Sequence, residues 1–581
     1  MRARAVKRRR GAWAAILALL ATAAPVAPAL ARDCAGDGPA FASIYPDDSL
    51  FRDALRAADA IAPSAVPLTG VTVPHHLLAP HLIAEGLKAA TGRRYDRILL
   101  VFPDHFRGTR KPFATTLRDV GTVFGPVPTD RTAAAALIAA DPALVDGASC
   151  LFGRDHGLQA LLPFIRALFP DVPVLPVAAS VRGKRADWDA MAALLAPFAG
   201  EGTLVVQSTD FSHFLPHHEA RIRDQQTLNV LAAGDLDQIA ALHQSGHADS
   251  LAALVVQGTL QRARGASPLV VANENGQQYD PRPVAETTSY MVVLYGRFPD
   301  AMPAPDWPRS QVVYLAGDTS FGRAMQEVFL HDAASEAIAE AVLSRTAGRP
   351  LLVNLEGVIL PNVPGSLDAM TLAMPRDLAL PWLKRLNVVA ASLANNHALD
   401  LGETGLAETR QALDTAGIAH AGQGGVLPLA GLDVVTLTDI GQNGTRDVDL
   451  VTPRLLDGLE LRPADRPLVG FIHWGGEYAA SPGQRELDLA QALSRRSFAA
   501  LVGGHSHVAS TRLAALAGGD TLLAHSLGNF IFDQSAERAS GALLEIRGFA
   551  QGTFFARLVP LPNLFDTGRG AVQQPGPEAS R

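Results

Sequence analysis

Apolar and polar positions alternate along this chain with two periods, one typical of strands and one of helices. Short apolar runs such as "RILLVFP" (97–103) and "VPVLPVAAS" (172–180) are bounded by polar or turn residues. Between them, segments such as 156–169 repeat apolar side chains every three or four positions. Apolar strands separated by amphipathic helices are typical of an α/β sheet that is covered on both faces. We therefore predict an α/β fold.

Two such alternating series are separated by a segment with four prolines and little apolar periodicity. A chain of 581 residues is long enough for two or more domains. The predicted division is a signal peptide at 1–31, a lead-in at 32–65, a first domain at 66–297, a proline-rich linker at 298–310, a second domain at 311–566 and a disordered tail at 567–581.

The first 31 residues have the three parts of a secretory signal. A basic start, "MRARAVKRRR", precedes a short apolar stretch and an Ala-Leu-Ala end. We expect export to the periplasm or the exterior, with an uncleaved membrane anchor as the alternative. Export implies an oxidising compartment, so Cys34 and Cys150 can form a disulfide, and two free thiols are the alternative.

Composition narrows the function classes. Hydrophobic residues make up 48% of the chain and charged residues 18%, which excludes general disorder. Without the six basic residues of the signal, 44 Lys and Arg remain against 57 Asp and Glu. This acidic balance gives no indication of nucleic-acid binding.

In the second half, several apolar strands are followed directly by side chains that can bind metal. Ligands bind at the carboxyl ends of strands in open α/β sheets, so these side chains should converge. Mixed oxygen and imidazole ligands suit Mn, Zn or Fe better than Ca. The residues are Asp318, Glu356, Asn396, His397, His473, His505 and His507.

The first half repeats this arrangement. His75, His105 and His213 each follow or end an apolar strand, and imidazoles from separate strands can bind Fe or Zn. Asp155 and His156 open a helix, where a carboxylate can cap the first turn.

Six motifs of the second half carry a resemblance. "GDTSFGR", "NLEG", "SLANNHALDLGETGL", "IHWGGEY", "GGHSHV" and "SLGNFIFD" occur in the order found in the CapA family of capsule and poly-γ-glutamate synthesis proteins. That family is similar in fold to the calcineurin-like metallophosphoesterases. The resemblance implies an α/β sandwich and covers about residues 311–560.

The resemblance also implies roles for individual residues. Asp318 would be the first carboxylate ligand and Glu356 the bridging one, while Asn396 would bind metal. His397 would orient the scissile group or protonate the leaving oxygen. One departure is Ser320, which stands where the phosphoesterases have a histidine and puts a two-metal site in doubt. The remaining ligands implied are His473, His505 and His507.

The first half resembles the Memo-like family, also known as protein B of the AmmeMemoRadiSam system. "VPHHLLAPH", "PDHF", "DHGLQALLPFIRALFPDVPVLPV", "STDFSHF" and "TTSYMVVLYG" occur in family order over about 70–296. The fold implied is that of the class III extradiol dioxygenases. The implied pocket ligands are His75, His105 and His213, with Asp155 and His156 nearby. The late cysteine of some members has no match, and a scaffold that binds no metal is the alternative.

Three functions follow as expectations. The first is an exported, metal-dependent hydrolase of phosphoester or amide bonds in capsule biogenesis, with His397 and Asn396 as catalytic residues and one or two Mn, Zn or Fe ions. The second is a non-catalytic protein that binds or assembles the polymer. The third is a metal-dependent redox activity of the first half, with Fe or Zn. The expected partners are an anionic envelope polymer or its precursor and capsule-synthesis membrane proteins, without nucleic acid.

Overall fold

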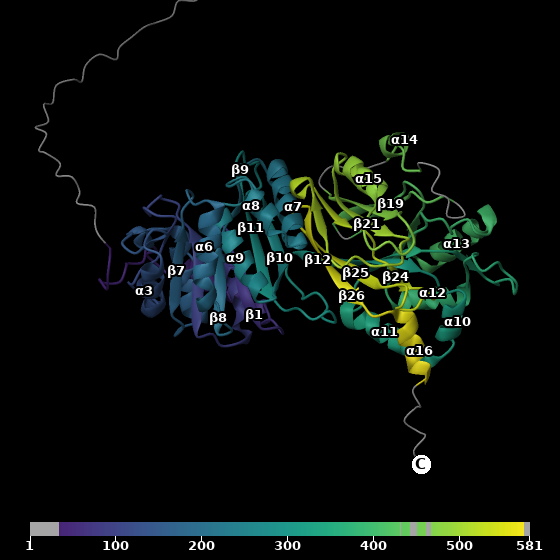
Figure 1. Ribbon diagram of the computed structural model, residues 1–581, viewed down its shortest axis with the longest axis horizontal. Coiled ribbons are helices and arrows are strands. Elements are labelled where there is room, and N and C mark those ends of the chain that lie inside the picture. The colour runs from purple at the N-terminus through teal and green to yellow at the C-terminus, as the bar shows by residue number, and fades with distance from the viewer. Residues whose placement is uncertain (1–33, 430, 442–449, 460–465, 574–581) are drawn as a thin grey trace, which may run out of the picture.

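The computed structural model describes residues 34–429, 431–441, 450–459 and 466–573, which form two α/β units side by side along the long axis (Figure 1). The predicted signal peptide at 1–31 lies outside the described residues. Within these ranges, none of the helices combines the length and the apolar character that a bilayer crossing requires.

The first unit is built on a nine-stranded mixed sheet. In pairing order its strands are β10 (Ser267–Asn275), β11 (Thr287–Gly296), β1 (Leu68–Val73), β8 (Thr203–Ser208), β2 (Arg97–Pro103), β7 (Val174–Ala179), β3 (Phe113–Ala114) and β6 (Val145–Asp146), with β9 (Phe211–Leu215) on β11. A separate hairpin joins β4 (Val120–Thr122) and β5 (Gly125–Val127). Because β1, β8, β2 and β7 run parallel, their carboxyl ends meet at one edge.

Helices pack against this sheet through apolar side chains at helical spacing. In helix α9 (Leu251–Ala263), Ser250 caps the first turn because its side chain accepts a hydrogen bond from the Ala253 amide. The side chains of Leu251, Leu254 and Val255 in this helix are buried. The helices are α1 (Ser49–Ala57), α2 (Pro80–Ala89), α3 (Arg131–Ala140), α4 (His156–Gln159), α5 (Leu162–Leu168), α6 (Arg185–Leu195), α7 (His217–Ala233), α8 (Leu236–Ala241) and α9 (Leu251–Ala263).

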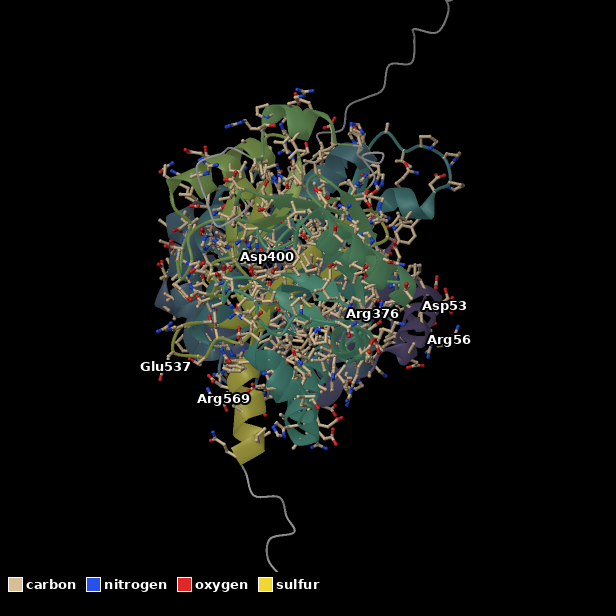
Figure 2. All side chains as sticks on the ribbon, turned by 90° about the vertical axis from the view of Figure 1, so that its right-hand side faces the viewer. Asp53, Arg56, Arg376, Asp400, Glu537 and Arg569 are labelled. Atoms are coloured by element: carbon tan, nitrogen blue, oxygen red, sulfur yellow. A yellow bond between two sulfur atoms is a disulfide. The ribbon has the colours of Figure 1, made fainter. Side chains whose placement is uncertain are left out.

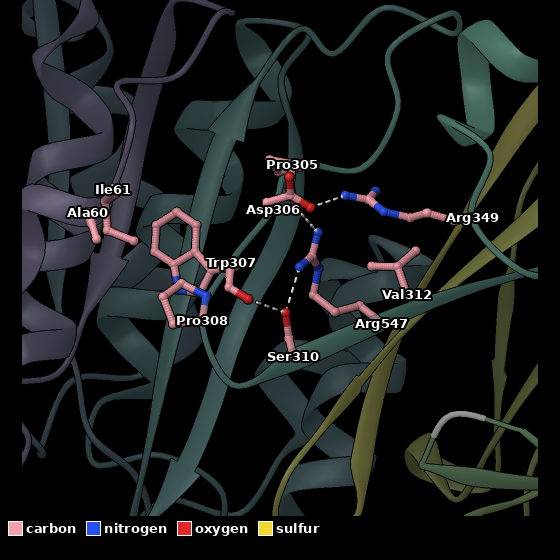
Figure 3. Close-up of a pocket in the computed structure, with 10 residues that line it drawn as sticks. All are labelled: Ala60, Ile61, Pro305, Asp306, Trp307, Pro308, Ser310, Val312, Arg349 and Arg547. Carbon is pink, nitrogen blue, oxygen red and sulfur yellow. Dashed lines mark hydrogen bonds and ion pairs between the residues drawn. The ribbon is translucent and has the colours of Figure 1, made fainter.

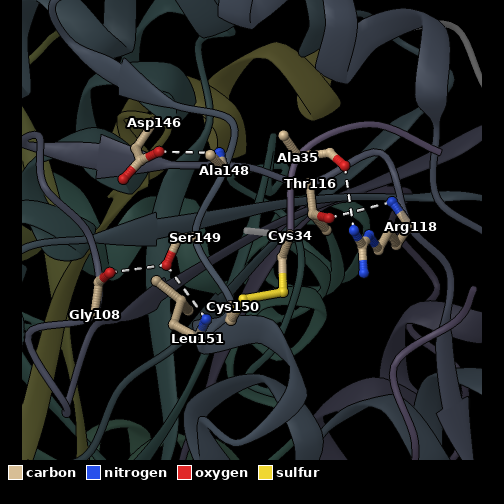
Figure 4. The surroundings of a disulfide bond; sticks show 10 residues. All are labelled: Cys34, Ala35, Gly108, Thr116, Arg118, Asp146, Ala148, Ser149, Cys150 and Leu151. Atoms are coloured by element: carbon tan, nitrogen blue, oxygen red, sulfur yellow. Dashed lines mark hydrogen bonds between the residues drawn. A yellow bond between two sulfur atoms is a disulfide. The ribbon is translucent and has the colours of Figure 1, made fainter. Parts of the chain in front are cut away.

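A disulfide ties the lead-in to the first unit. It joins Cys34 to Cys150, which are 116 residues apart in sequence (Figure 4). The Cys34 amide also donates to the carbonyl of Ala148. Further along, Phe51 is buried, with its ring 5.3 Å from that of Phe164. The lead-in is therefore part of the first core, and the structure has the disulfide rather than two free thiols.

Replacing both cysteines with serine is expected to lower the free energy of unfolding of the first unit by about 2–5 kcal/mol, because the long loop is no longer closed in the unfolded chain. Urea unfolding of wild type and double variant measures the difference. Wild type treated with a reductant is the control and should behave like the variant. Coincident unfolding curves in all three cases would show that the crosslink does not stabilise the fold.

The described part of the second unit is built on two large sheets. The seven-stranded sheet has β17 (Ala419–Ala421), β16 (Val388–Ser392), β13 (Leu351–Leu355), β12 (Ser310–Thr319), β25 (Gly541–Phe549) and β26 (Thr553–Leu561) in pairing order, with β24 (Asn529–Ile531) on β12. The six-stranded sheet has β18 (Val426–Leu429), β19 (Leu432–Thr438), β20 (Leu468–His473), β21 (Phe498–Gly504), β23 (Thr521–Ala524) and β22 (Ala514–Leu516). A small pair joins β14 (Val358–Leu360) and β15 (Ala373–Pro375).

These sheets stack face to face, with helices on their outer faces. Leu315, Leu352, Val434 and Phe471 belong to one buried cluster that both sheets share. The first sheet's outer face is covered by α10 (Ala324–Phe329), α11 (Asp332–Thr346), α12 (Arg376–Arg385), α13 (Gly402–Ala416) and α16 (Leu564–Gln573), and the second sheet's by α14 (Pro453–Asp457) and α15 (Gln484–Ser494). The predicted α/β sandwich is confirmed.

One segment was predicted wrongly. The tail at 567–581 is helical in α16 as far as Gln573, and only 574–581 lie outside the described residues. In the structure Gly568 allows a close approach to α10, because a Cβ there would lie 2.4 Å from Val328 Cγ1. Burial of Leu564 against the same core holds the helix in place.

The predicted linker at 298–310 connects the two units but is not a free spacer. Trp307 is buried, and Arg309 forms ion pairs with Glu85 and Glu274 of the first unit. The Arg309 Nη2 to Glu85 Oε2 distance is 2.9 Å. Proline content indicated an irregular backbone but gave no sign of these contacts.

Helix α7 of the first unit packs on the second. Gln225 exchanges two hydrogen bonds with the backbone of Phe554, and Asn229 donates to the carbonyls of Ala499 and Gly519. Beside them, the buried carboxylate of Asp224 accepts from Ser212, Asn273 and Gln551. Such satisfied buried polar groups fix the orientation of two surfaces.

Burial raises the pKa of Asp224 from 3.8 to about 6. Between pH 4 and 6 the folded chain therefore holds a proton that the unfolded chain releases, so the free energy of unfolding should fall as pH rises, by up to about 3 kcal/mol. Urea unfolding of wild type and Asp224→Asn across pH 4–7 tests this, since the variant lacks this slope. Parallel pH profiles would contradict the prediction.

Candidate metal centres

Strand ends of both sheets bring the predicted residues of the second unit together. Asp318 lies near the end of β12, Glu356 follows β13, and Asn396 and His397 lie in the loop after β16. His473 is the last residue of β20, while His505 and His507 follow β21. Of these seven, only His397 is not fully buried. The site thus lies between two sheets at their carboxyl edges.

Asp318 occupies the centre of the arrangement. Its Oδ1 accepts from Asn354 Nδ2 at 2.8 Å, and its Oδ2 lies 3.2 Å from His507 Nδ1. Burial opposes its charge, but these hydrogen bonds and the neighbouring imidazoles lower its pKa to about 2. Gly504 is needed here because a Cβ would stand 2.8 Å from Asp318 Oδ1. Asp318 is therefore an ionised, fixed carboxylate.

Two groups of ligand atoms share Glu356. In the first, Glu356 lies with His473 and His505, and in the second with Asp318 and His507; the ligand atoms of each group lie within 4.8 Å of one another. Glu356 Oε2 is buried and has no hydrogen-bond partner among the described residues. Burial, followed by the charge of Asp318, raises the pKa of Glu356 to about 7. An unpartnered buried carboxylate oxygen fits a bound cation, and Glu356 could contribute a ligand atom to either group.

The imidazole of His473 lies between the side-chain amide of Asn396 and the imidazole of His505. Its Nε2 lies 2.8 Å from Asn396 Oδ1 and 3.1 Å from His505 Nδ1. Burial, followed by the nearby His505, lowers the pKa of His473 well below 6.5. His473 is therefore a neutral imidazole, which is the form that binds metal.

Both histidines of the "GHSH" loop adopt left-handed backbone conformations, with φ of 79° at His505 and 58° at His507. Non-glycine residues in this region are uncommon and concentrate at functional sites. His507 Nδ1 also lies 2.8 Å from Asn529 Oδ1. Hydrogen bonding to Asp318 outweighs burial and raises the pKa of His507 to about 9. A cation would compete with that proton.

His397 is held differently from the ligands. Its Nδ1 lies 2.8 Å from Asp400 Oδ2, and its Nε2 lies 3.7 Å from Glu356 Oε1. Asp400 is labelled in Figure 2, on the side of the second unit. The amide of Asn395 holds the loop, donating to the carbonyl of Leu355 and accepting from the His397 N–H. The imidazole is thus oriented by a carboxylate at the rim of the site, as a proton donor would be.

Sequence reasoning missed Asn354, Asp400 and Asn529, which position Asp318, His397 and His507. For two of them, the spacing in the sequence could have indicated their place at the site. Asn354 lies on β13 two residues before Glu356, which is the spacing that places two side chains on one face of an extended chain. Asp400 stands three residues after His397, one turn away. Asn529 had no such indication, because it is distant in sequence.

The first unit gathers a second constellation at the carboxyl edge of its sheet. The ring centroids of His75 and His105 are 4.8 Å apart, and those of His105 and His156 are 3.9 Å apart. Asp155 caps α4 by accepting from the Gly157 amide, as predicted, and its Oδ1 lies 2.8 Å from His105 Nδ1. His75 Nδ1 lies 3.0 Å from Ser208 Oγ. Because both Nδ1 atoms are in hydrogen-bond contact, the Nε2 atoms of His75 and His105 face a common point.

Asp249, which the sequence did not reveal, lies at that point. Its Oδ2 is 3.2 Å from His75 Nε2 and 3.6 Å from His105 Nε2. Its Oδ1 is buried without a partner among the described residues. Two groups of ligand atoms cluster here: His75 with His105 and His156, and His75 with Asp210 and Asp249. His213 lies nearby but belongs to neither group.

Neighbouring charged groups in this pocket shift the pKa values of its histidines in opposite directions. Burial disfavours a proton on His105, but hydrogen bonds to Asp155 and Asp249 outweigh it and raise the pKa of His105 to about 10. Burial and the neighbouring His105 lower the pKa of His156 to about 4. The clustered imidazole and carboxylate ligand atoms of this pocket could hold a metal ion.

Comparisons with known proteins agree with the two halves. Residues 312–431 and 460–534 match the family described as bacterial capsule synthesis protein PGA_cap, and residues 50–255 match the Memo-like protein family. The PGA biosynthesis protein CapA of Bacillus subtilis (strain 168) is 29% identical over 31% of this chain and 52% of its own length. The capsule biosynthesis protein CapA of Bacillus anthracis is 28% identical over 31% of this chain and 49% of its own. The chain spans about half the length of these relatives.

Similar solved structures include an uncharacterized protein from Escherichia coli K12, at 16% identity, covering 38% of this chain and 98% of that one, with a TM-score of 0.28. Another is a phosphatase from Mycoplasma pneumoniae, at 14% identity, covering 46% and 97%, also with a TM-score of 0.28. The family resemblances inferred from motifs are confirmed by the sequence matches: the chain joins an N-terminal Memo-like domain to a C-terminal PGA_cap domain.

Proposed function

We propose that the chain is an exported, metal-dependent hydrolase of phosphoester- or amide-type bonds that acts in the biogenesis of an anionic capsule polymer of the poly-γ-glutamate type. The observation that carries this proposal is Glu356, whose carboxylate is shared by two groups of buried ligand atoms. The names of the CapA relatives support the polymer. Envelope location and capsule-synthesis membrane partners are part of the same proposal.

The chain's own residues supply orientation and a proton. Asp318, Glu356, Asn396, His473, His505 and His507 would hold one or two Mn, Zn or Fe ions. A divalent ion there supplies positive charge to a developing oxyanion and lowers the pKa of a water. His397, which Asp400 orients through Nδ1, has its Nε2 directed to the site and would protonate the leaving group.

The test uses the mature protein and bis(p-nitrophenyl) phosphate, with Mn²⁺, Zn²⁺ or Fe²⁺ supplied separately. We expect turnover that chelation abolishes and that His505→Ala lowers by at least about 100-fold. His218→Ala, which changes an exposed histidine of the first unit, is the matched control and should keep full activity. Metal-loaded protein that cleaves neither this diester nor a γ-glutamyl amide would contradict the hydrolase assignment.

A non-catalytic role is favoured by one residue. Ser320 stands where phosphoesterases carry a histidine, so one ligand is missing. In this alternative the metal site binds carboxylates of the polymer without cleaving it. Stoichiometric, metal-dependent binding of poly-γ-glutamate with unchanged polymer length would support this role, and shortening of the polymer would exclude it.

The first unit supports a second candidate function, a metal-dependent redox activity at His75, His105 and Asp249. The observation that favours it is the Asp249 carboxylate between the two imidazoles. Reconstitution with Fe²⁺ under anaerobic conditions should give bound iron in wild type, and Asp249→Asn should bind it at least about 10-fold more weakly. Oxygen consumption by the iron-loaded wild type, but not by the variant, is expected. Iron bound without oxygen consumption would eliminate this function.

A further inference from the structure

A cavity of about 330 Å³ lies where the lead-in, the connecting segment and the second unit meet (Figure 3). Ile61 lines it from the lead-in, Trp307 from the connecting segment, Val312 from β12 and Arg547 from β25. None of these residues takes part in either metal centre. The cavity therefore needs an explanation of its own.

Two buried N–H groups of the cavity lining lack acceptors among the described residues. These are Nε of Arg547 and Nε1 of Trp307. Arg547 is 1% exposed and Trp307 8% exposed. A buried donor without an acceptor costs about 1–3 kcal/mol, so two on one cavity point to an acceptor that occupies it.

The cavity also carries excess positive charge. Arg349 and Arg547 both line it, and Asp306 is the one carboxylate among the lining residues. Asp306 pairs with Arg349 and is fully exposed. Glu545, behind Arg547, accepts from Arg557 at 2.9 Å. Burial, only partly offset by Glu545, lowers the pKa of Arg547 to about 10, so its charge is poorly compensated.

We propose that this cavity binds a small organic carboxylate. The carboxylate would accept from the free donors of Arg547 and Trp307 and balance the net positive charge. The ligand's apolar part would lie against the indole and the side chains of Ile61 and Val312. The two terminal nitrogens of Arg547 already donate to Ser310 Oγ and the Pro305 carbonyl, so the guanidinium is held in place before a ligand binds.

A carboxylate fits better than phosphate. Two guanidinium groups and one carboxylate leave one net positive charge, which a monoanion balances, while phosphate carries about −1.5 to −2 at pH 7. Each terminal nitrogen of Arg547 already gives one of its two N–H groups to Ser310 Oγ or the Pro305 carbonyl, so fewer donors remain for the several oxygens of a phosphate. Apolar walls add favourable contact only for an organic ligand.

Isothermal titration of the mature full-length protein with benzoate tests the proposal, with benzyl alcohol as the neutral analogue and inorganic phosphate as the second anion. We expect saturable binding of benzoate at one site, and weaker or no binding of the other two. Trp307→Phe keeps the ring and removes the donor, and Arg349→Gln removes a charge; each should weaken benzoate binding about tenfold.

Arg569→Gln, on α16 and outside the cavity lining, is the matched control and should leave binding unchanged. Thermal unfolding of each variant confirms that it is folded. Absence of saturable benzoate binding to wild type would overturn the proposal. So would equal binding of benzoate by wild type and both cavity variants, or tighter binding of phosphate than of benzoate. None of these outcomes depends on hydrolase activity.

Discussion

Replacing His397 with alanine is expected to lower the rate of metal-dependent phosphodiester hydrolysis by about 10²- to 10⁴-fold while leaving bound metal unchanged. The imidazole is oriented by Asp400 through Nδ1, and its Nε2 is 3.7 Å from Glu356 rather than in hydrogen-bond contact with the ligand set. It is therefore placed to transfer a proton and not to hold the cation. Steady-state kinetics and elemental analysis of the same preparation measure the two effects separately.

His420→Ala is the matched control, because His420 also pairs with an aspartate, Asp414, at 3.1 Å but lies away from the site. It should retain full activity. Asp400→Asn should show a smaller loss than His397→Ala, with metal again retained. If His397→Ala loses metal and activity together, His397 is a ligand and the assignment as proton donor is wrong.

Replacing Glu356 with glutamine is expected to weaken metal binding by more than about 100-fold, because both groups of ligand atoms lose their shared carboxylate. In the absence of metal, by contrast, glutamine at this position should not lower the stability of the fold. Burial and Asp318 disfavour the charge of Glu356, raising its pKa to about 7, so the neutral amide should not destabilise the metal-free fold above neutral pH. Metal titration and thermal unfolding at pH 8 measure these effects.

Glu477→Gln, a change at an exposed carboxylate, is the control and should alter neither property. A metal-free Glu356→Gln protein that unfolds several degrees below wild type would indicate a structural role for the carboxylate. Unchanged metal affinity would show that Glu356 is not a ligand.

The convergence of the candidate ligands of the second unit was predictable, because ligand-type side chains occur there at the ends of periodic apolar strands. Asp318, Glu356 and His473 each lie at or just after the end of an apolar strand, and parallel strands bring their carboxyl ends to the same edge. The side chain of Asn395 accepts from the backbone of its own loop, as Asx side chains at turns commonly do.

Other features depend on contacts between residues that are distant in sequence, which a local sequence pattern does not predict. Asp249 lies in an irregular segment before α9 and reaches the histidines only through the folding of the first unit. His213 had the stronger sequence signal, but it lies in the middle of β9 and outside the clustered ligand atoms. Likewise, the tail was predicted to be disordered, although Gly568 allows a helix to pack closely.

Elemental analysis of the purified mature protein tests the central claim most directly. We compare wild type, His505→Ala and Asp249→Asn after growth with Mn, Zn and Fe present. The two constellations predict that wild type carries metal, that His505→Ala loses the share bound by the second unit, and that Asp249→Asn loses only the share bound by the first. Metal content that neither substitution lowers would contradict both metal centres.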